Sequence, residues 1–64
     1  MATWEIVYDS IRDGRTYING TVTTTRDSGS ITDGEARTAV VEHHRANGAN
    51  ASHVWVMRTA EVGA

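Results

Sequence analysis

The chain has 64 residues, no cysteine and a formal net charge of −2, and all six of its Lys/Arg residues are arginine. A chain this short forms one domain and buries only about 60% of its unfolded surface, so its margin of stability is thin. The missing cysteines exclude disulfides and thiolate metal sites, and the slightly acidic charge counts against nonspecific nucleic-acid binding, which needs a basic field.

Apolar and polar residues alternate over residues 3–11 and again over residues 15–25. A period of two is typical of strands that bury one face, and the Asp13-Gly14 dipeptide marks a turn between them. A strict two-residue loop at this turn would set Ile6 opposite Thr21. That register mixes apolar and polar residues on both faces, which a half-buried sheet does not tolerate.

We therefore predict a three-residue loop over residues 12–14, with Gly14 in the left-handed conformation beside a bulge. In this register all the apolar residues of the hairpin share one face. The predicted pairs are Trp4 with Val22, Ile6 with Gly20, and Tyr8 with Ile18.

A polar connection leads to a predicted helix over residues 33–47. Thr32 and Glu35 have the spacing of a capping box, which opens a helix, and Asn47-Gly48 supplies the stop. On a helical wheel the inward-facing cluster is Ala36, Ala39, Val40 and His43.

The last predicted strand covers residues 53–59. The inner face of the helix carries small side chains, so large sheet residues must fill the space beneath it, which favours Trp55 and Met57 inward. Val54 and Val56 then point outward. The reverse arrangement stays open, and it would leave Trp55 and Met57 as an exposed apolar patch.

The fold class is α+β: a single ββαβ domain over residues 1–64, with a three-stranded antiparallel sheet and one helix packed on one face. We expect the strand order 2-1-3, because an all-antiparallel sheet accommodates one wet face. Pairing of the last strand parallel to the second is the alternative. The predicted core is Trp4, Ile6, Tyr8, Ile18, Val22, Ala36, Ala39 and Val40, with Trp55 and Met57.

Three histidines are the only candidate metal ligands of note. Adjacent residues on a helix point about 100° apart, so one metal ion cannot easily take both His43 and His44. We expect His43 at the core edge, His44 in solvent and His53 at a strand entry, with no metal site and no cofactor. A metal pair of His44 and His53, completed by a carboxylate such as Glu42, is the alternative hypothesis.

The sequence predicts no enzyme. It holds no Gly-x-Ser-x-Gly elbow and no His–Asp pair fixed beside a serine, and none of its carboxylates has the apolar setting typical of an acid catalyst.

The leading hypothesis is a noncatalytic protein-interaction or regulatory module that forms a homodimer or docks on a larger protein. Its layout is similar to that of many small accessory proteins of phages and mobile elements. The candidate partner-binding residues are Tyr17, Val41, Val54 and Val56.

The competing hypothesis is a small nucleic-acid-binding protein that stacks bases on an arginine-flanked sheet face. Its candidate residues are Arg12, Arg15, Tyr17 and Arg58. No apolar run approaches the roughly 20 residues of a membrane span and no signal-peptide pattern is present, so we expect a soluble, cytoplasmic protein.

Overall fold

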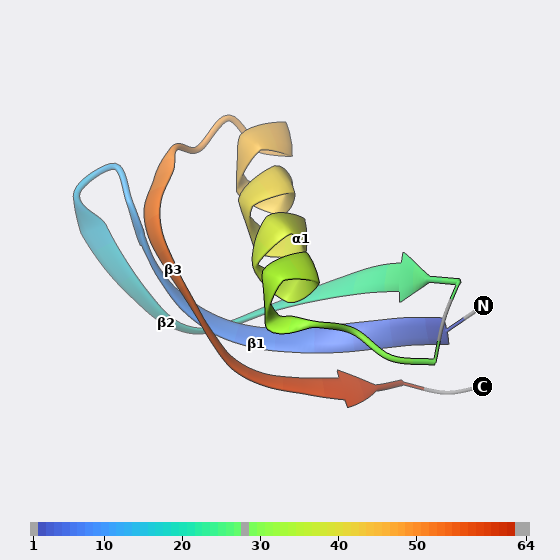
Figure 1. The fold of residues 1–64 in the computed structure, drawn as a ribbon. Coiled ribbons are helices and arrows are strands. Elements are labelled where there is room, and N and C mark those ends of the chain that lie inside the picture. The colour runs from blue at the N-terminus through green and yellow to red at the C-terminus, as the bar shows by residue number, and fades with distance from the viewer. Residues whose placement is uncertain (1, 28, 63–64) are drawn as a thin grey trace.

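The computed structural model describes residues 2–27 and 29–62, so Ser28 of the expected polar connection lies outside the described residues. The elements are β1 (Ala2–Arg12), β2 (Arg15–Arg26), α1 (Asp33–Ala46) and β3 (Ala51–Glu61). Both strand pairs are antiparallel, the order is β2-β1-β3, and α1 packs on one face of the sheet (Figure 1). The predicted α+β class, the ββαβ topology and the 2-1-3 order are confirmed.

The sheet is strongly curved. Figure 1 shows the hairpin end of β1 and β2 bending up beside α1, whereas both termini lie at the other, flatter end. We call the side that carries α1 the concave face and the opposite side the convex face. Side-chain alternation places Ile6, Tyr8 and Ser10 of β1 on the concave face, where all three are buried.

The turn between β1 and β2 has two residues, so the predicted three-residue loop is wrong. Arg12 pairs with Arg15, and the two residues between them both have positive φ, 52° at Asp13 and 78° at Gly14. Two successive positive φ values are the signature of a type I′ turn, whose twist matches that of the flanking strands.

A bulge in β2 makes this short turn compatible with a one-sided apolar face. Tyr8 pairs with Gly20 and Ser10 pairs with Tyr17, so Ile18 and Asn19 together oppose a single β1 residue. Asn19 has φ 56°, and its N–H donates a hydrogen bond of 3.0 Å to Asp9 Oδ1.

The extra residue shifts the register, so the side chains of β2 between the turn and the bulge lie on the opposite face from the one predicted. The predicted pairs are therefore wrong: Ile6 pairs with Val22, Tyr8 with Gly20 and Trp4 with Thr24. Tyr17 moves to the concave side, opposite Ser10. Alternation then places Ile18 on the convex face, and it is 70% exposed rather than in the core.

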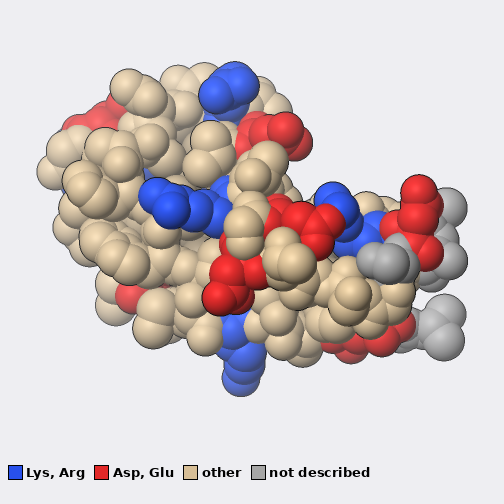
Figure 2. All heavy atoms as spheres, viewed as in Figure 1, with Lys and Arg blue, Asp and Glu red and all other residues tan. Residues whose placement is uncertain are grey.

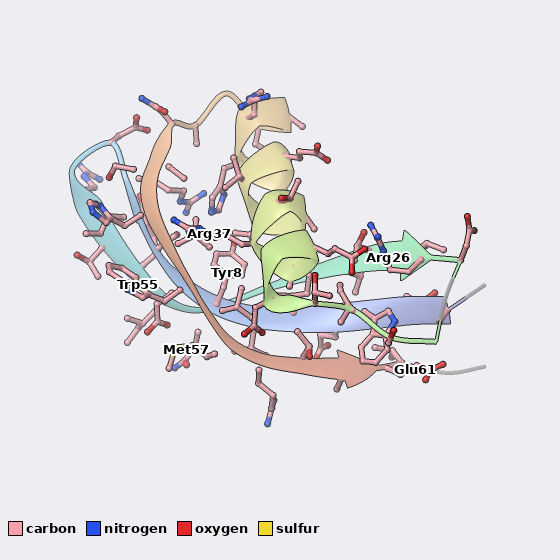
Figure 3. All side chains as sticks on the ribbon, viewed as in Figure 1. Tyr8, Arg26, Arg37, Trp55, Met57 and Glu61 are labelled. Atoms are coloured by element: carbon pink, nitrogen blue, oxygen red, sulfur yellow. The ribbon has the colours of Figure 1, made fainter. Side chains whose placement is uncertain are left out.

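A second bulge lies directly across β1 from the first. Val7 pairs with Arg58 and Tyr8 pairs with Val56, which leaves Met57 as the extra residue of β3. Val54 and Val56 therefore face α1, and the predicted inward positions of Trp55 and Met57 are wrong. Figure 3 shows both of these side chains on the side of β3 away from α1.

The capping box of α1 is confirmed. The N–H of Glu35 donates to Thr32 Oγ1 at 3.1 Å, and the N–H of Thr32 donates to Glu35 Oε1 at 3.0 Å. Arg26, at the end of β2, forms an ion pair with the same carboxylate and so ties β2 to the start of the helix. Asn47 is the C-cap, close to the predicted end.

The buried stripe of α1 is Ala36, Val40 and His44, spaced by four residues. The predicted roles of the two helix histidines are thus reversed: His44 is fully buried and His43 is exposed. The imidazole of His44 meets the ring of Tyr8 edge-on, with centroids 5.3 Å apart. These two rings fill the space that the prediction assigned to Trp55 and Met57.

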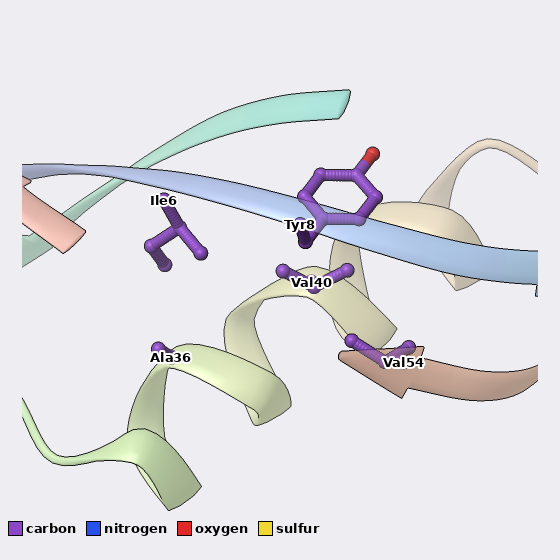
Figure 4. Packing of buried hydrophobic residues seen from close by; sticks show 5 residues of the cluster. All are labelled: Ile6, Tyr8, Ala36, Val40 and Val54. Carbon is purple, nitrogen blue, oxygen red and sulfur yellow. The ribbon is translucent and has the colours of Figure 1, made fainter. Parts of the chain in front are cut away.

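The core is a compact cluster between α1 and the concave face (Figure 4). Its buried members are Ile6, Tyr8, Ala36, Val40 and Val54, and its partly buried neighbours are Val22, Ile31, Ala39, Val41, Ala51 and Val56. Of the predicted core residues, Ile6, Tyr8, Ala36 and Val40 are buried in the cluster, and Val22 and Ala39 pack against it. Ile18 is exposed, and Trp4 is partly buried but not part of the cluster. Val41, expected in solvent, packs against the cluster.

Gly20 is the position where the core leaves no room for a side chain. A Cβ placed there would lie 2.7 Å from Cζ of Tyr8, because the ring lies across the glycine backbone. We expect Gly20→Ala to lower the free energy of unfolding by about 1–3 kcal/mol, the usual cost of overpacking. Urea unfolding followed by circular dichroism measures it.

Gly34→Ala is the matched control, since a Cβ there meets only Thr32 Oγ1 at 3.9 Å. Its stability should be unchanged or slightly raised, because alanine favours a helix. Equal stability of Gly20→Ala and the native chain would contradict the packing of Tyr8 over this strand.

Candidate functional site

The convex face carries large apolar side chains that no element covers. Trp55 is 48% exposed, Met57 is 60% exposed and Ile18 is 70% exposed. Val7 and Ile11 of β1 lie on the same face and are only partly buried. We call these five residues the convex patch.

The indole of Trp55 is the largest side chain of the convex patch. Trp55 pairs with Asp9 across β3 and β1, and its ring stacks on the imidazole of His53 with centroids 5.7 Å apart and planes inclined by 14°. Stacking on the imidazole restricts the orientation of the indole. A large aromatic surface held in one orientation loses little entropy when a partner covers it.

Charged groups of both signs lie within and beside the convex patch. Arg58 pairs with Val7, and Glu5 and Asp9 lie two residues to either side of Val7 on β1. Period-two alternation puts all of these side chains on the convex face. The face therefore combines apolar side chains with one cation and two carboxylates, and Asp9 lies between Ile18 on β2 and Trp55 on β3. A mixed patch of this kind is typical of a protein-binding surface.

The four side chains predicted to bind a partner do not form one surface. Val54 is 8% exposed and faces α1 together with Val56, and Val41 packs against the core. Tyr17 is 38% exposed, but it lies on the concave side of β2. Trp55 and Met57 occupy the position on the outer sheet face that the two valines were expected to hold.

The predicted nucleic-acid residues are divided between the two faces. The guanidinium of Arg12 lies over the ring of Tyr17, with its Cζ 3.9 Å from the centroid, on the concave side. Arg15 pairs with Arg12 beside the turn, whereas Arg58 lies on the convex face. Over the described residues seen in Figure 2, acidic and basic side chains are interspersed, without a continuous basic stripe.

A second notable cluster surrounds His44 inside the protein. Its Nε2 lies 3.3 Å from Ser10 Oγ, and its Nδ1 lies 3.5 Å from Nη1 of Arg12. Ser10 is also fully buried. Burial away from water, the charge of Arg12 and the neighbouring His43 all lower the pKa of His44 below its ordinary value of 6.5.

The pair of Ser10 and His44 lacks the geometry of an activated nucleophile. In a catalytic triad the second imidazole nitrogen donates to a carboxylate, which stabilises the protonated ring. Here that nitrogen faces the guanidinium of Arg12, which has the opposite effect, and neither side chain is exposed to solvent. The cluster is therefore a structural contact between α1 and β1.

The alternative metal pair is contradicted by the geometry. His44 is buried on the concave side, and His53 stacks on Trp55 on the convex face. Within residues 2–27 and 29–62, no three His, Asp or Glu side chains are grouped to hold a metal ion.

Hollows on the surface run along α1 and β2 and are open to solvent. Their volumes are about 280, 330 and 210 Å³, near or below the lower limit of small-molecule pockets. They are lined mainly by Thr, Glu and Arg side chains of the exposed surfaces. The convex patch is therefore the better candidate for a binding function.

Sequence reasoning gave an exposed patch of Trp55 and Met57 only as the alternative and placed Ile18 in the core, because the faces of these residues depend on the bulges in β2 and β3. It missed the His44 cluster for a different reason: the helical wheel drew the inward face through Ala36, Ala39, Val40 and His43, which left His44 in solvent, whereas the buried helix residues are Ala36, Val40 and His44. The spacing of four was the signal that could have found it.

Comparison with protein-family models, with curated proteins and with solved structures finds no match to this chain. Among the described residues, no helix has the length and apolar character needed to cross a membrane.

The bulge at Asn19 determines which way Ile18 points, so it can be tested by substitution. Asn19→Val should lower the free energy of unfolding by roughly 1 kcal/mol or more, because a β-branched residue is strained at φ 56°. Asn19→Gly should change it by less than about 0.5 kcal/mol, since glycine adopts positive φ freely. Thermal and urea unfolding of the two variants measure the difference; equal stabilities would contradict the bulge.

Proposed function

We propose that the protein is a noncatalytic, self-associating interaction module of the cytoplasm, in which the convex patch of one copy docks on that of a second copy. The observation that carries this proposal is the exposure of Trp55, Met57 and Ile18 together on the sheet face that α1 leaves uncovered.

A second copy is favoured as the occupant by the size of the core. The core cluster has five buried members among the described residues, and only one of them is a large aromatic side chain. A small domain with no disulfide gains much of its missing stability by association, and a two-fold dimer covers the same patch on both copies at once. Two sheets packed face to face bury their apolar side chains in one shared layer.

The charges on the convex face suit such a two-fold arrangement. Arg58 lies beside Val7, and Glu5 and Asp9 lie on either side of that residue along β1. When the face meets a copy of itself, the guanidinium of one copy can approach a carboxylate of the other. Opposite charges set among the apolar side chains fix the orientation of the two copies and disfavour a staggered one.

The same features disfavour a strand of nucleic acid as the occupant. The stacked pair of Trp55 and His53 offers an aromatic platform, but the carboxylates of Glu5 and Asp9 stand beside it. Phosphates bind where cations dominate, and Arg58 is a single cation on this face.

Trp55→Glu tests the interface directly. We expect the native chain to sediment as a dimer and the variant as a monomer, with at least a tenfold rise in the dissociation constant, because a charge replaces the large aromatic side chain. The variant should keep its circular dichroism spectrum, since the indole is 48% exposed in the single chain. Sedimentation over a concentration series measures both masses.

Val62→Glu is the matched control, because Val62 is a similarly exposed apolar residue (45%) that follows β3 and lies outside the convex patch. It should leave the dimer intact. A native chain that stays monomeric at high concentration would overturn the proposal. A mass increase with a single-stranded oligonucleotide that disappears in salt would instead support nucleic-acid binding.

A further inference from the structure

Among the described residues of α1, His44 is the only buried one with a polar side chain. It lies near the C-terminal end of the helix, the end toward which the curved hairpin bends (Figure 1). Its two ring nitrogens face Ser10 and Arg12 of β1, and its ring meets Tyr8 of the same strand. Ala36 and Val40 hold the helix by apolar contact alone. The polar attachment of α1 to the central strand therefore depends on this one ring.

The partners of the ring determine which nitrogen carries the proton. A guanidinium has only N–H groups to offer, so Nδ1, which faces Nη1 of Arg12 at 3.5 Å, accepts. Nε2 then carries the hydrogen and donates to Ser10 Oγ at 3.3 Å. This arrangement uses both nitrogens of a neutral imidazole and requires the Nε2–H tautomer.

A second proton cannot be accommodated in this arrangement. It would add an N–H at Nδ1, pointing at the N–H groups of a cation, so two donors and two positive charges would meet. Arg12 cannot turn away freely, because its guanidinium also lies over the ring of Tyr17 from β2.

The remaining neighbours of the imidazole contribute no negative charge that would stabilise its protonated form. His43, on α1 itself, has its ring centroid 5.8 Å away, and the ring of Tyr8 on β1 is inclined by 70° to the imidazole with centroids 5.3 Å apart. On the β3 side the residue paired with Ser10 is Val54, which is apolar. Among residues 2–27 and 29–62, no carboxylate bonds to the imidazole.

We propose that the His44 cluster is an acid-sensitive latch, which holds α1 on β1 while the imidazole is neutral and releases the helix when the ring takes up a proton. This inference is independent of the convex patch and of its partner.

The direction of the pH effect follows from proton linkage. The pKa of His44 is lowered in the folded chain, while the unfolded chain keeps the ordinary value of 6.5. Between these two values the unfolded state binds more protons than the folded state, so stability falls as the pH decreases. Within that window one proton raises the unfolding equilibrium constant by up to about tenfold for each pH unit.

The first experiment is nitrogen NMR of the imidazoles in the native chain. At pH 7.5 the His44 signals should show the Nε2–H tautomer, and on acidification they should titrate below pH 6.5 or disappear as the helix contacts are lost. A Nδ1–H tautomer, or a titration midpoint at or above 6.5, would overturn the proposal.

The second experiment follows urea unfolding from pH 8 to pH 5 in variants. His44→Gln keeps a donor near Ser10 but cannot take up a proton, so its unfolding constant should rise much less over this range than that of the native chain. Gly34→Ala is the control, because it lies outside both the convex patch and the His44 cluster, and it should keep the native pH dependence.

Arg12→Met separates the effect of the Arg12 charge on the pKa of His44 from the effect of burial. It keeps an apolar side chain over Tyr17 and removes the charge that faces Nδ1. The titration midpoint of His44 should move upward in this variant. An unchanged midpoint would contradict the role of Arg12 in the latch, and equal pH dependence in His44→Gln and the native chain would contradict the latch itself.

Discussion

The rest of the structure depends on the bend at Tyr8 and Asp9, where both neighbours of the central strand carry an extra residue. Ile18 and Asn19 share one partner on the β2 side, and Met57 is unpaired on the β3 side. Bulges bend a strand and increase its twist, and two of them at one level of β1 curve the whole sheet. A strand residue advances about 3.3 Å and a helix residue about 1.5 Å, so the strands are longer than the helix of 14 residues. The curvature lets this shorter helix pack against the concave side of the sheet.

The same bend explains how the core is filled although the helix contributes small side chains. Tyr8 lies at the bend with its ring across Gly20, and that ring makes a T-shaped contact with the imidazole of His44. A glycine on the facing strand makes the close approach possible, and the aromatic ring in turn shields the glycine backbone. Only Val54 is then needed from β3 to complete the buried cluster, so the larger Trp55 is left outside.

Local sequence patterns were sufficient to predict the helix and the three strands. They were insufficient to predict which face of the sheet each side chain occupies. Alternation over the strands, the capping box at Thr32 and the stop at Asn47 each depend on neighbours within a few residues, and they located all four elements and their order. The direction of Ile18 and Trp55 depends on the extra residues that β2 and β3 carry relative to β1, which alternation within one strand does not reveal. The burial of His44 depends on Ser10 and Arg12, more than 30 residues away in sequence.

The strand order also sets the sequence of events during synthesis. β1 is made first, yet its second neighbour is β3, so a pair such as Trp4 and Glu61 can form only after nearly all of the intervening chain has left the ribosome. Until then the hairpin and helix lack Val54 from their core, and the free side of β1 presents unpaired backbone groups. Closure by β3 is a distant contact, and such contacts form slowly. The nascent chain is therefore most open to chaperones, and to wrong partners, in the interval before its last strand arrives.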